Sequence, residues 1–234
     1  MSTSCFRDVT GPLSGPRGRL QQAVDYDESG PVTAPDSTPW QLPRARRSSQ
    51  PWANGQGVSE SVSRHVPDEP RDEILWRVNI ADIPGDCDFS QLVGVDRQFM
   101  LLDDVELTLE LDLPRLVQPL EPIEFAGEMA PVCRAAAPAR AINLLMQRDR
   151  VFGRLELVTV TRSVHIPVPP GGSVVVVKLD GDPTWRGGRD LRPGDAVRLD
   201  RPVLGGPIAL PLSGHGRVAA ISVLPIYPRH RDDE

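Results

Sequence analysis

The sequence is poor in several residue types, and each shortage excludes a class of protein. Only three of its 234 residues are cysteines. This odd and sparse count gives no disulfide framework and suits a reducing cytoplasm. No apolar run reaches the roughly 18 residues needed to span a bilayer, and the opening residues lack the apolar segment of a signal peptide. We therefore predict a cytoplasmic protein without a membrane segment.

Histidine and the common catalytic motifs are also scarce. The four histidines, His65, His165, His215 and His230, are far apart in the sequence, and no CxxC or His-x-His pair accompanies them. A zinc or iron site needs several such ligands around one ion. A Gly-x-Ser-x-Gly nucleophile elbow and a glycine-rich phosphate loop are missing as well. We predict no metal, no cofactor and no catalytic residue, although His165 and His215 could still meet within the C-terminal half.

The charge balance excludes another group of partners. The formal net charge is -6 and the isoelectric point is near 5.3. An acidic protein repels the phosphates of nucleic acids and the headgroups of anionic membranes, so we predict neither partner. The short basic run "RARRSS", residues 44–49, is interpreted as a solvated loop.

What the sequence does contain is proline, glycine and short alternating segments. Its 25 prolines and 20 glycines disfavour long helices and favour short strands joined by turns. In "LWRVNIADI", Trp76, Val78 and Ile80 fall on one face, and Arg77 and Asn79 fall on the other. This period of two is typical of a half-buried strand.

The same alternation recurs through the rest of the chain. Residues 105–111 alternate after the acidic pair Asp103-Asp104, which we interpret as a hairpin turn. Other strand-like segments are "INLLMQ", "RLELVTVTRS", "GGSVVVV" and "GRVAAISVLP". We expect about 12 to 16 short strands. The pattern runs twice, over residues 76–150 and 155–226, and so predicts two packed antiparallel barrels or sandwiches.

Composition divides the chain into three parts. Residues 1–38 have almost no apolar periodicity and cannot offset their ordering entropy, so we predict a disordered N-terminal extension. Residues 39–228 form the predicted folded domain. Residues 229–234, "RHRDDE", are charged and are predicted to be a flexible tail.

Five segments, in this order, resemble one family. They are "PWANGQGVSESV", "WRVNIADI", "DFSQLVGVDRQFMLL", "LEPIEFAGEMAPV" and "RAINLLMQR". Together they resemble the HutD/Ves family of cupin-like proteins associated with histidine utilisation, over about residues 39–228. The resemblance implies an all-β bicupin fold, with two jelly-roll-like antiparallel β-barrels in one domain. It also implies a small-molecule-binding or regulatory role rather than a reaction.

Several positions depart from the family pattern. Ala53 and Gln147 are neutral where the family has basic residues, Gln56 replaces a glycine, Val93 a proline and Ala141 an acid. If the family's basic residues hold an acidic ligand, these changes imply weaker binding or a different ligand.

Polar side chains on predicted strands are the best candidates for contact with a ligand. A guanidinium group in the mouth of a barrel can hold a carboxylate by two parallel hydrogen bonds. The alternative for Arg97 is a corner with Asp96 that ties a loop, and the alternative for Asn143 is a structural hydrogen bond. The candidate ligand-binding residues are Trp52, Asn54, Arg77, Arg97, Asn143 and Arg148.

Two of the three cysteines lie in the predicted folded domain. Cys133 lies in a strand-like segment before Arg134, which would favour its thiolate, but we interpret Cys133 as a buried structural thiol. Cys87 lies between two acids, which oppose its ionisation. Neither is predicted to be a nucleophile, and Cys5 falls in the extension.

These observations predict a cytoplasmic, non-enzymatic protein that binds a small, acidic metabolite. Two alternatives remain open at this stage. The first is a cupin-type isomerase or hydrolase with a degenerate site. The second is a protein-interaction scaffold, and a homodimer paired through edge strands would be compatible with either binding or scaffolding.

Overall fold

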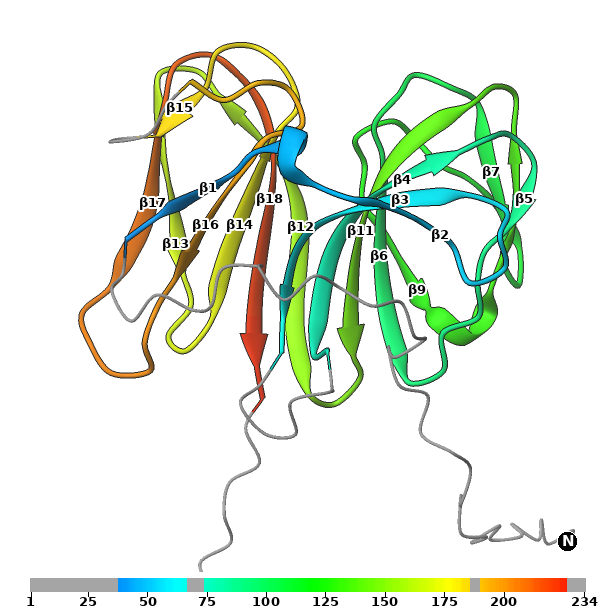
Figure 1. The fold of residues 1–234 in the computed structure, drawn as a ribbon, viewed down its shortest axis with the longest axis horizontal. Helices are drawn as coiled ribbons and strands as arrows, with labels where there is room; N and C mark the ends of the chain where they lie inside the picture. Colours follow the sequence, from blue (N-terminus) through cyan, green and yellow to red (C-terminus); the bar gives the residue numbers. More distant parts are fainter. Residues whose placement is uncertain (1–37, 67–73, 186–189, 227–234) are drawn as a thin grey trace, which may run out of the picture.

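The structure is a computed structural model that describes residues 38–66, 74–185 and 190–226 (Figure 1). These ranges contain 18 strands and two short 3-10 helices, η1 (Arg44–Arg46) and η2 (Gly127–Met129). Within the same ranges, no helix has the length and apolar character needed to cross a membrane. Apart from Thr38, the predicted extension over 1–38 lies outside the described residues, as does the predicted tail over 229–234.

The N-terminal barrel consists of two antiparallel sheets. Its larger sheet has the order β2-β3-β4-β11-β6-β9, formed by β2 (Ser49–Pro51), β3 (Val58–His65), β4 (Trp76–Ile83), β11 (Ala139–Gln147), β6 (Val95–Leu101) and β9 (Ile123–Ala126). Its smaller sheet has the order β5-β10-β7-β8, formed by β5 (Cys87–Asp88), β10 (Val132–Ala135), β7 (Leu107–Glu110) and β8 (Pro114–Leu116).

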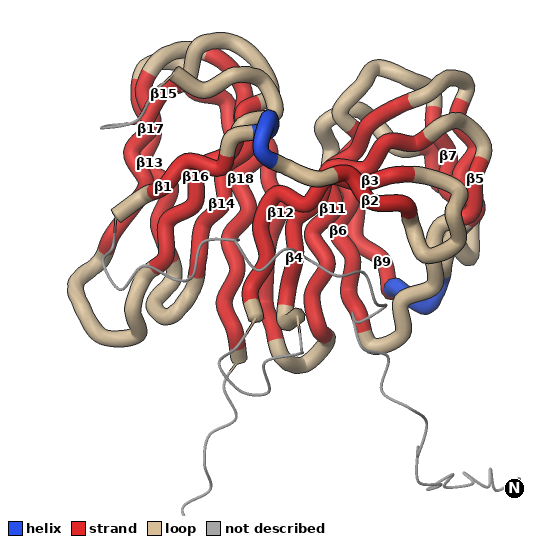
Figure 2. Tube along the Cα trace, viewed as in Figure 1, coloured by secondary structure: helices blue, strands red, loops and turns tan. Residues whose placement is uncertain are grey.

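The C-terminal barrel is built in the same way. Its larger sheet has the order β1-β16-β14-β18-β12, formed by β1 (Trp40–Leu42), β16 (Ala196–Asp200), β14 (Ser173–Lys178), β18 (Gly216–Pro225) and β12 (Val151–Val160). Its smaller sheet has the order β13-β17-β15, formed by β13 (Ser163–Val168), β17 (Ile208–Ser213) and β15 (Thr184–Trp185). The strands of the two barrels lie side by side (Figure 2).

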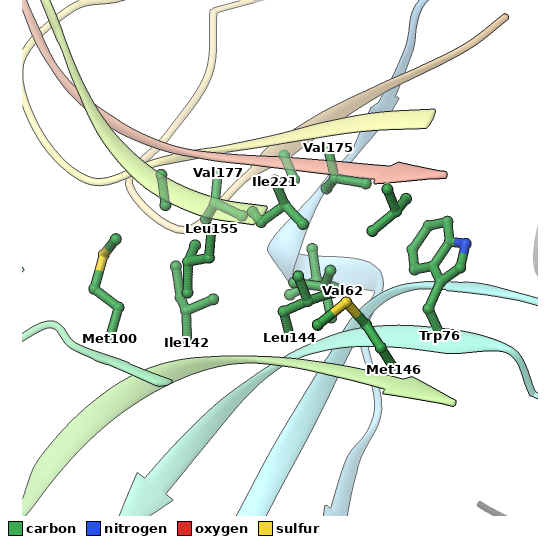
Figure 3. Packing of buried hydrophobic residues seen from close by; sticks show 14 of the residues in the cluster. Val62, Trp76, Met100, Ile142, Leu144, Met146, Leu155, Val175, Val177 and Ile221 are labelled. Atoms are coloured by element: carbon green, nitrogen blue, oxygen red, sulfur yellow. The ribbon is translucent and has the colours of Figure 1, made fainter. Parts of the chain in front are cut away.

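The two larger sheets pack face to face and form a core between the barrels. Figure 3 shows Ile142, Leu144 and Met146 of β11 opposite Val175 of β14 and Ile221 of β18. All of these side chains are buried. Burial of apolar surface at ~25 cal/mol per Å² is the main force that holds the two barrels together.

The alternation read from the sequence explains how one strand serves two cores. On β4, Trp76, Val78 and Ile80 belong to the core between the barrels. Arg77 and Asn79 point the opposite way, into the N-terminal barrel, because successive side chains of a strand face opposite sides. On β14 the run "SVVVV" is buried on both faces, which is why it shows no alternation.

The first strand of the chain belongs to the C-terminal barrel (Figure 1). Trp40 pairs with Arg198 in the antiparallel register of β1 and β16. Arg198 is stacked between the rings of Trp40 and Trp76, at 5.4 and 4.8 Å from their centroids. It also donates two hydrogen bonds to the carboxylate of Asp200, at 2.8 and 3.0 Å. The sequence repeat over 155–226 did not include this strand.

The basic run over residues 44–49 forms a tie between the barrels, so its interpretation as a solvated loop is wrong. Arg44 makes hydrogen bonds of 2.9–3.2 Å with Glu60 of β3, and its backbone N–H donates to Asp195 at 2.7 Å. The side chain of Arg47 donates to the carbonyl of Leu42, and burial lowers its pKa to about 10. Arg44 thus links β3 of one barrel to the turn before β16 of the other.

The predicted hairpin at Asp103-Asp104 is also wrong. Strand β6 pairs with β11 and β9, whereas β7 pairs with β10 and β8, so the chain crosses between sheets at this point. The carboxylate of Asp103 accepts hydrogen bonds from the backbone and guanidinium of Arg140 instead, at 2.7 and 2.8 Å. The number of strands exceeds the expected range because several, such as β5 and β15, have only two residues.

Candidate functional site

Polar residues gather on the inner face of the N-terminal barrel, on three neighbouring strands. In the middle strand, β11, Asn143 pairs with Asn79 of β4 on one side and with Phe99 of β6 on the other. Two positions further along β11, Leu145 lies between Arg77 and Arg97 in the same way. The register therefore places two arginines and two asparagines on one face, which we call the polar end of the barrel.

The opposite end of the same face is apolar. Ala141 pairs with Ala81 and Leu101, and Ala139 pairs with Ile83. Residues of both sheets fill this end, including Leu107 and Leu109 of β7. The interior thus changes from a packed hydrophobic core to a polar end along the length of the strands.

Arg97 is the most unusual residue of the polar end. Its side chain is only 7% exposed, and no hydrogen bond or ion pair to its guanidinium is found among the described residues. Its contacts are the rings of Phe89 and Phe125, at 5.2 and 5.6 Å from the guanidinium carbon. Burial, together with the smaller effect of the nearby charge of Arg77, lowers its pKa to about 10.

Amide groups beside Arg97 also have unused hydrogen-bonding capacity. Asn79 and Gln147 are each 7% exposed. The Oδ1 atom of Asn79 and the Nε2 atom of Gln147 are buried and have no hydrogen-bond partner within the described ranges. Buried polar atoms in folded proteins are nearly always paired, so unpaired atoms on the face that carries Arg97 mark a place for a ligand or water.

The arginine that follows β11, Arg148, shows the usual arrangement instead. Arg148 donates to Asp96 at 2.8 Å and to Glu128 at 2.8–2.9 Å, at the end of β11. The hydrogen bond from Arg148 is the main reason why the pKa of Glu128 is lowered to about 2. Arg148 therefore ties η2 to β6 and β11, and we leave it out of the binding proposal.

The segment "PWANGQG", residues 51–57, which we call the opening motif, closes one side of the N-terminal barrel. Trp52 packs edge-to-face on Phe89, with ring centroids 5.7 Å apart. Its ring also covers Gly57, where a Cβ atom would come within 2.7 Å of the indole. Because Phe89 in turn contacts Arg97, the aromatic side chains link the motif to the polar end. Trp52, predicted as a ligand-binding residue, thus packs as an apolar anchor beside Phe89.

Polar residues of the same motif fasten it to β5. Asn54 donates from its side chain to the carbonyl of Asp88 at 2.6 Å. The side chain of Gln56 donates to the carboxylate of Asp88 and accepts from its backbone N–H, at 3.0 and 2.6 Å. Gln56, a departure from the family pattern, thus has a structural function. Asn54 is exposed and turned toward Asp88 rather than Arg97.

The histidines of the described chain do not come together. His65 stacks on Trp76 with a centroid distance of 6.2 Å, whereas His165 lies on β13 and His215 precedes β18. His230 lies outside the described residues. Throughout the part of the chain that the structure describes, no group of three His, Cys, Asp or Glu side chains could hold a metal ion.

A surface groove of about 590 Å³ lies at the apolar end of the barrel, away from Arg97. It is lined by Pro51, Gly55, Gln56, Gly57, Val58, Asp82, Ile83, Pro84, Asp103, Pro138, Ala139 and Arg140. Two of its three charged residues, Arg140 and Asp103, already pair with each other. Size alone does not mark a ligand site, so we place the candidate site at the polar end.

Sequence reasoning identified Arg77, Arg97 and Asn143 but missed their aromatic and amide neighbours. Phe89 and Phe125 come from segments far apart in the chain, and only the pairing of β6 with β9 places Phe125 next to Arg97. A usable signal existed for Asn79 and Gln147, because both share the inward phase of their strands with the predicted residues.

Comparison with known proteins identifies relatives of this chain. A profile of the HutD family matches residues 44–220. The chain is 32% identical over 109 residues to an uncharacterised 21.2 kDa protein from the region 3′ of hutC in Pseudomonas putida, covering 45% of this chain and 57% of that protein. It is 28% identical over 110 residues to the protein Ves of Citrobacter koseri, covering 45% of this chain and 56% of that protein. The chain thus spans little more than half the length of these curated relatives.

The fold extends over more of the chain than these alignments. The solved structure of HutD from Pseudomonas fluorescens SBW25, in a formate condition, matches with a TM-score of 0.69 and 23% identity. The match covers 81% of this chain and 100% of that chain. The predicted all-β bicupin fold is confirmed by the two barrels and by this similarity. Because the family profile covers most of its length, the chain belongs to the HutD family.

Proposed function

We propose that this protein is a non-enzymatic, cytoplasmic, cupin-like protein that binds a small, anionic metabolite at the polar end of its N-terminal barrel. Its role would be regulatory and linked to histidine utilisation. The family assignment supports that link, as does the position beside hutC of the relative in Pseudomonas putida. The sparse cysteines support the cytoplasmic location.

The buried cation Arg97 is the observation that carries the proposal. A guanidinium removed from water without a carboxylate partner is unfavourable by several kcal/mol. The rings of Phe89 and Phe125 offset part of this cost, at centroid distances of 5.2 and 5.6 Å. A bound anion would offset the rest, and a carboxylate matches the fork of a guanidinium in shape and charge.

The unpaired amide atoms narrow the chemistry of the ligand. The Nε2 atom of Gln147 is a donor and would suit a second anionic or carbonyl oxygen. The Oδ1 atom of Asn79 is an acceptor and requires an N–H or O–H group. The best match is therefore a small carboxylate that also carries an N–H or O–H group.

Thermal unfolding with a panel of acids tests this proposal. The panel contains glutamate, N-formylglutamate, urocanate, histidine and formate, each at several concentrations. A ligand at 100 times its dissociation constant stabilises the folded state by ~2.7 kcal/mol, which raises the melting temperature by about 5–10 °C for a chain of this size. Substitution Arg97→Gln should abolish the shift.

Arg140→Gln is the matched control, because Arg140 is a half-exposed arginine on the same sheet, paired with Asp103. This variant should keep the full ligand-induced shift. The proposal would be wrong if no acid of the panel raised the melting temperature, or if Arg97→Gln responded as the parent does.

A further inference from the structure

Two cysteines from distant parts of the sequence face each other across neighbouring strands. In the antiparallel register of β5 and β10, Cys87 lies directly opposite Cys133. Both thiols are free and buried, with exposures of 5% and 0%. They belong to the interior of the N-terminal barrel together with Phe89. A pair of thiols in this register is a different feature from a single buried cysteine, because the two can react with each other.

The geometry of the pair suits a bond between the sulfur atoms. The backbone N–H of Phe89 donates to the carbonyl of Pro131 at 3.0 Å, so the pair two residues away is of the hydrogen-bonded type. Such pairs have Cα atoms about 5.5 Å apart, within the range of about 4.4–6.8 Å found across disulfides. The two thiols are close enough for each to influence the pKa of the other. We propose that Cys87 and Cys133 form a reversible intramolecular disulfide when the protein meets a peroxide.

Cys87 is the thiol that an oxidant reaches first. It lies on β5, a strand of two residues at the edge of the smaller sheet, whereas β10 is covered by β5 and β7 on its two sides. Asp88, the next residue of β5, is exposed and holds the loop of the opening motif. Local opening of such a short edge strand exposes Cys87 without unfolding of the barrel.

The reaction balances with hydrogen peroxide as the oxidant. The Cys87 thiolate attacks one oxygen of the peroxide, the O–O bond breaks, and the products are a sulfenic acid at Cys87 and hydroxide. The sulfur of Cys133 then attacks the sulfur of the sulfenic acid, which forms the S–S bond and releases the second hydroxide. Protons from the two thiols convert both hydroxides into water, so two thiols and one peroxide give one disulfide and two waters.

The environment of the thiols makes this reaction slow at neutral pH. Burial raises the pKa of Cys87, the neighbouring thiol of Cys133 acts in the opposite direction, and the acids Asp88 and Asp86 raise the pKa as well. Burial raises the pKa of Cys133 to about 12. Because the thiolate is the reactive form, the rate of oxidation should rise roughly tenfold per pH unit between neutral pH and the pKa of Cys87.

The bond would act on the polar end through one side chain. Phe89 directly follows β5, two positions after Cys87, and its ring contacts both Trp52 and Arg97. A disulfide would fix β5 against β10 and hold this ring in place. The inference itself needs no ligand, so it stands or fails separately from the proposed function.

The test uses the full chain with Cys5→Ser, so that only the two barrel thiols remain. The folded protein is treated with hydrogen peroxide, and free thiols are then counted after denaturation, with intact mass and peptide mapping. We expect loss of both thiols, a mass decrease of two hydrogen atoms, a linked peptide pair and recovery with dithiothreitol. The melting temperature should rise by up to about 10 °C, since the bond closes a long loop.

Single variants Cys87→Ala and Cys133→Ala in the same background are the controls. Each keeps one thiol, and neither should show the mass decrease or the gain in melting temperature. The inference is overturned if the folded parent keeps both thiols under conditions that oxidise the urea-unfolded chain. It is equally overturned if peroxide yields only linked dimers or sulfinic acids.

Discussion

Replacing Arg97 by methionine should stabilise the ligand-free protein, which is the opposite of what a core substitution usually does. Methionine retains an unbranched side chain that can pack between Phe89 and Phe125, but it carries no charge. Substitution of a buried charge by a well-packed apolar residue is often neutral or stabilising by 1–4 kcal/mol, on the order of what is expected here.

The magnitude follows from the surroundings of the guanidinium. A pKa lowered to about 10 corresponds to a penalty of ~3 kcal/mol for the charged form, at ~1.4 kcal/mol per pH unit. At pH 7 the folded and unfolded chains both carry the proton, so the whole penalty is present. It would fade only as the pH rises above about 10, where the folded state loses the proton first. Arg97→Met also loses two cation–π contacts near the outer limit of their range, which reduces the expected gain in stability by ~1–2 kcal/mol.

The net expectation is a gain of ~1–2 kcal/mol, or a rise in melting temperature of about 2–8 °C. Calorimetry and urea unfolding at pH 7 measure it, with Arg140→Met as the matched variant. Arg140 is 45% exposed and paired with Asp103 at 2.8 Å, so its loss should change stability by less than about 1 kcal/mol. A clear destabilisation by Arg97→Met would refute the description of Arg97 as a buried cation without a partner.

Three further substitutions test other parts of the structure. Trp52→Ala should destabilise the fold by ~1–3 kcal/mol, because the half-buried indole packs on Phe89, and an unchanged unfolding midpoint would contradict its role as an anchor. Arg198→Ala should lower the free energy of unfolding in urea by ~3–5 kcal/mol, because it removes the cation between two tryptophans and leaves Asp200 without its ion-pair partner. A loss below ~1 kcal/mol would contradict the importance of this ion pair. The carboxylate of Glu128 has a pKa lowered to about 2, so its contribution is complete above its unfolded pKa of about 4.5 and is lost as the pH falls toward 2. In Glu128→Gln the free energy of unfolding should therefore fall less steeply as the pH is lowered from about 4.5 toward 2. An unchanged slope would mean that the pair with Arg148 contributes nothing to stability.

Local patterns predicted the strands well because side-chain alternation depends on short-range geometry. The phase of β4, with Trp76 and Val78 on one face and Arg77 and Asn79 on the other, could be read from the sequence. The burial of both faces could not, because the sequence predicted a half-buried strand. Strand pairing depends on contacts between distant residues, and there the sequence was insufficient. The acidic pair at Asp103 has the composition of a hairpin turn, but the partners of β6 and β7 place it between sheets.

In the candidate site, too, local features could be predicted from the sequence, whereas contacts between distant residues could not. Arg77, Arg97 and Asn143 could be selected because polar residues interrupt apolar strands. The ring contact between Phe89 and Arg97, and the pairing of Cys87 with Cys133, arise only after β5 is placed beside β10. Arg148 had the same local appearance as Arg97, and only the carboxylates of Asp96 and Glu128 in three dimensions distinguish a structural ion pair from an unpaired cation.

The position of β1 has a consequence for the synthesis of the chain. Residues 40–42 leave the ribosome before every other described strand, yet their partner β16 follows about 160 residues later. At about 5–20 residues per second, the first strand waits about 8–30 s for its partner. The N-terminal barrel can assemble during that interval, whereas the larger sheet of the C-terminal barrel gains its last edge only when the beginning and the end of the domain meet. Until β16 has been synthesised, Trp40 lacks the strand partner that it has in the folded domain.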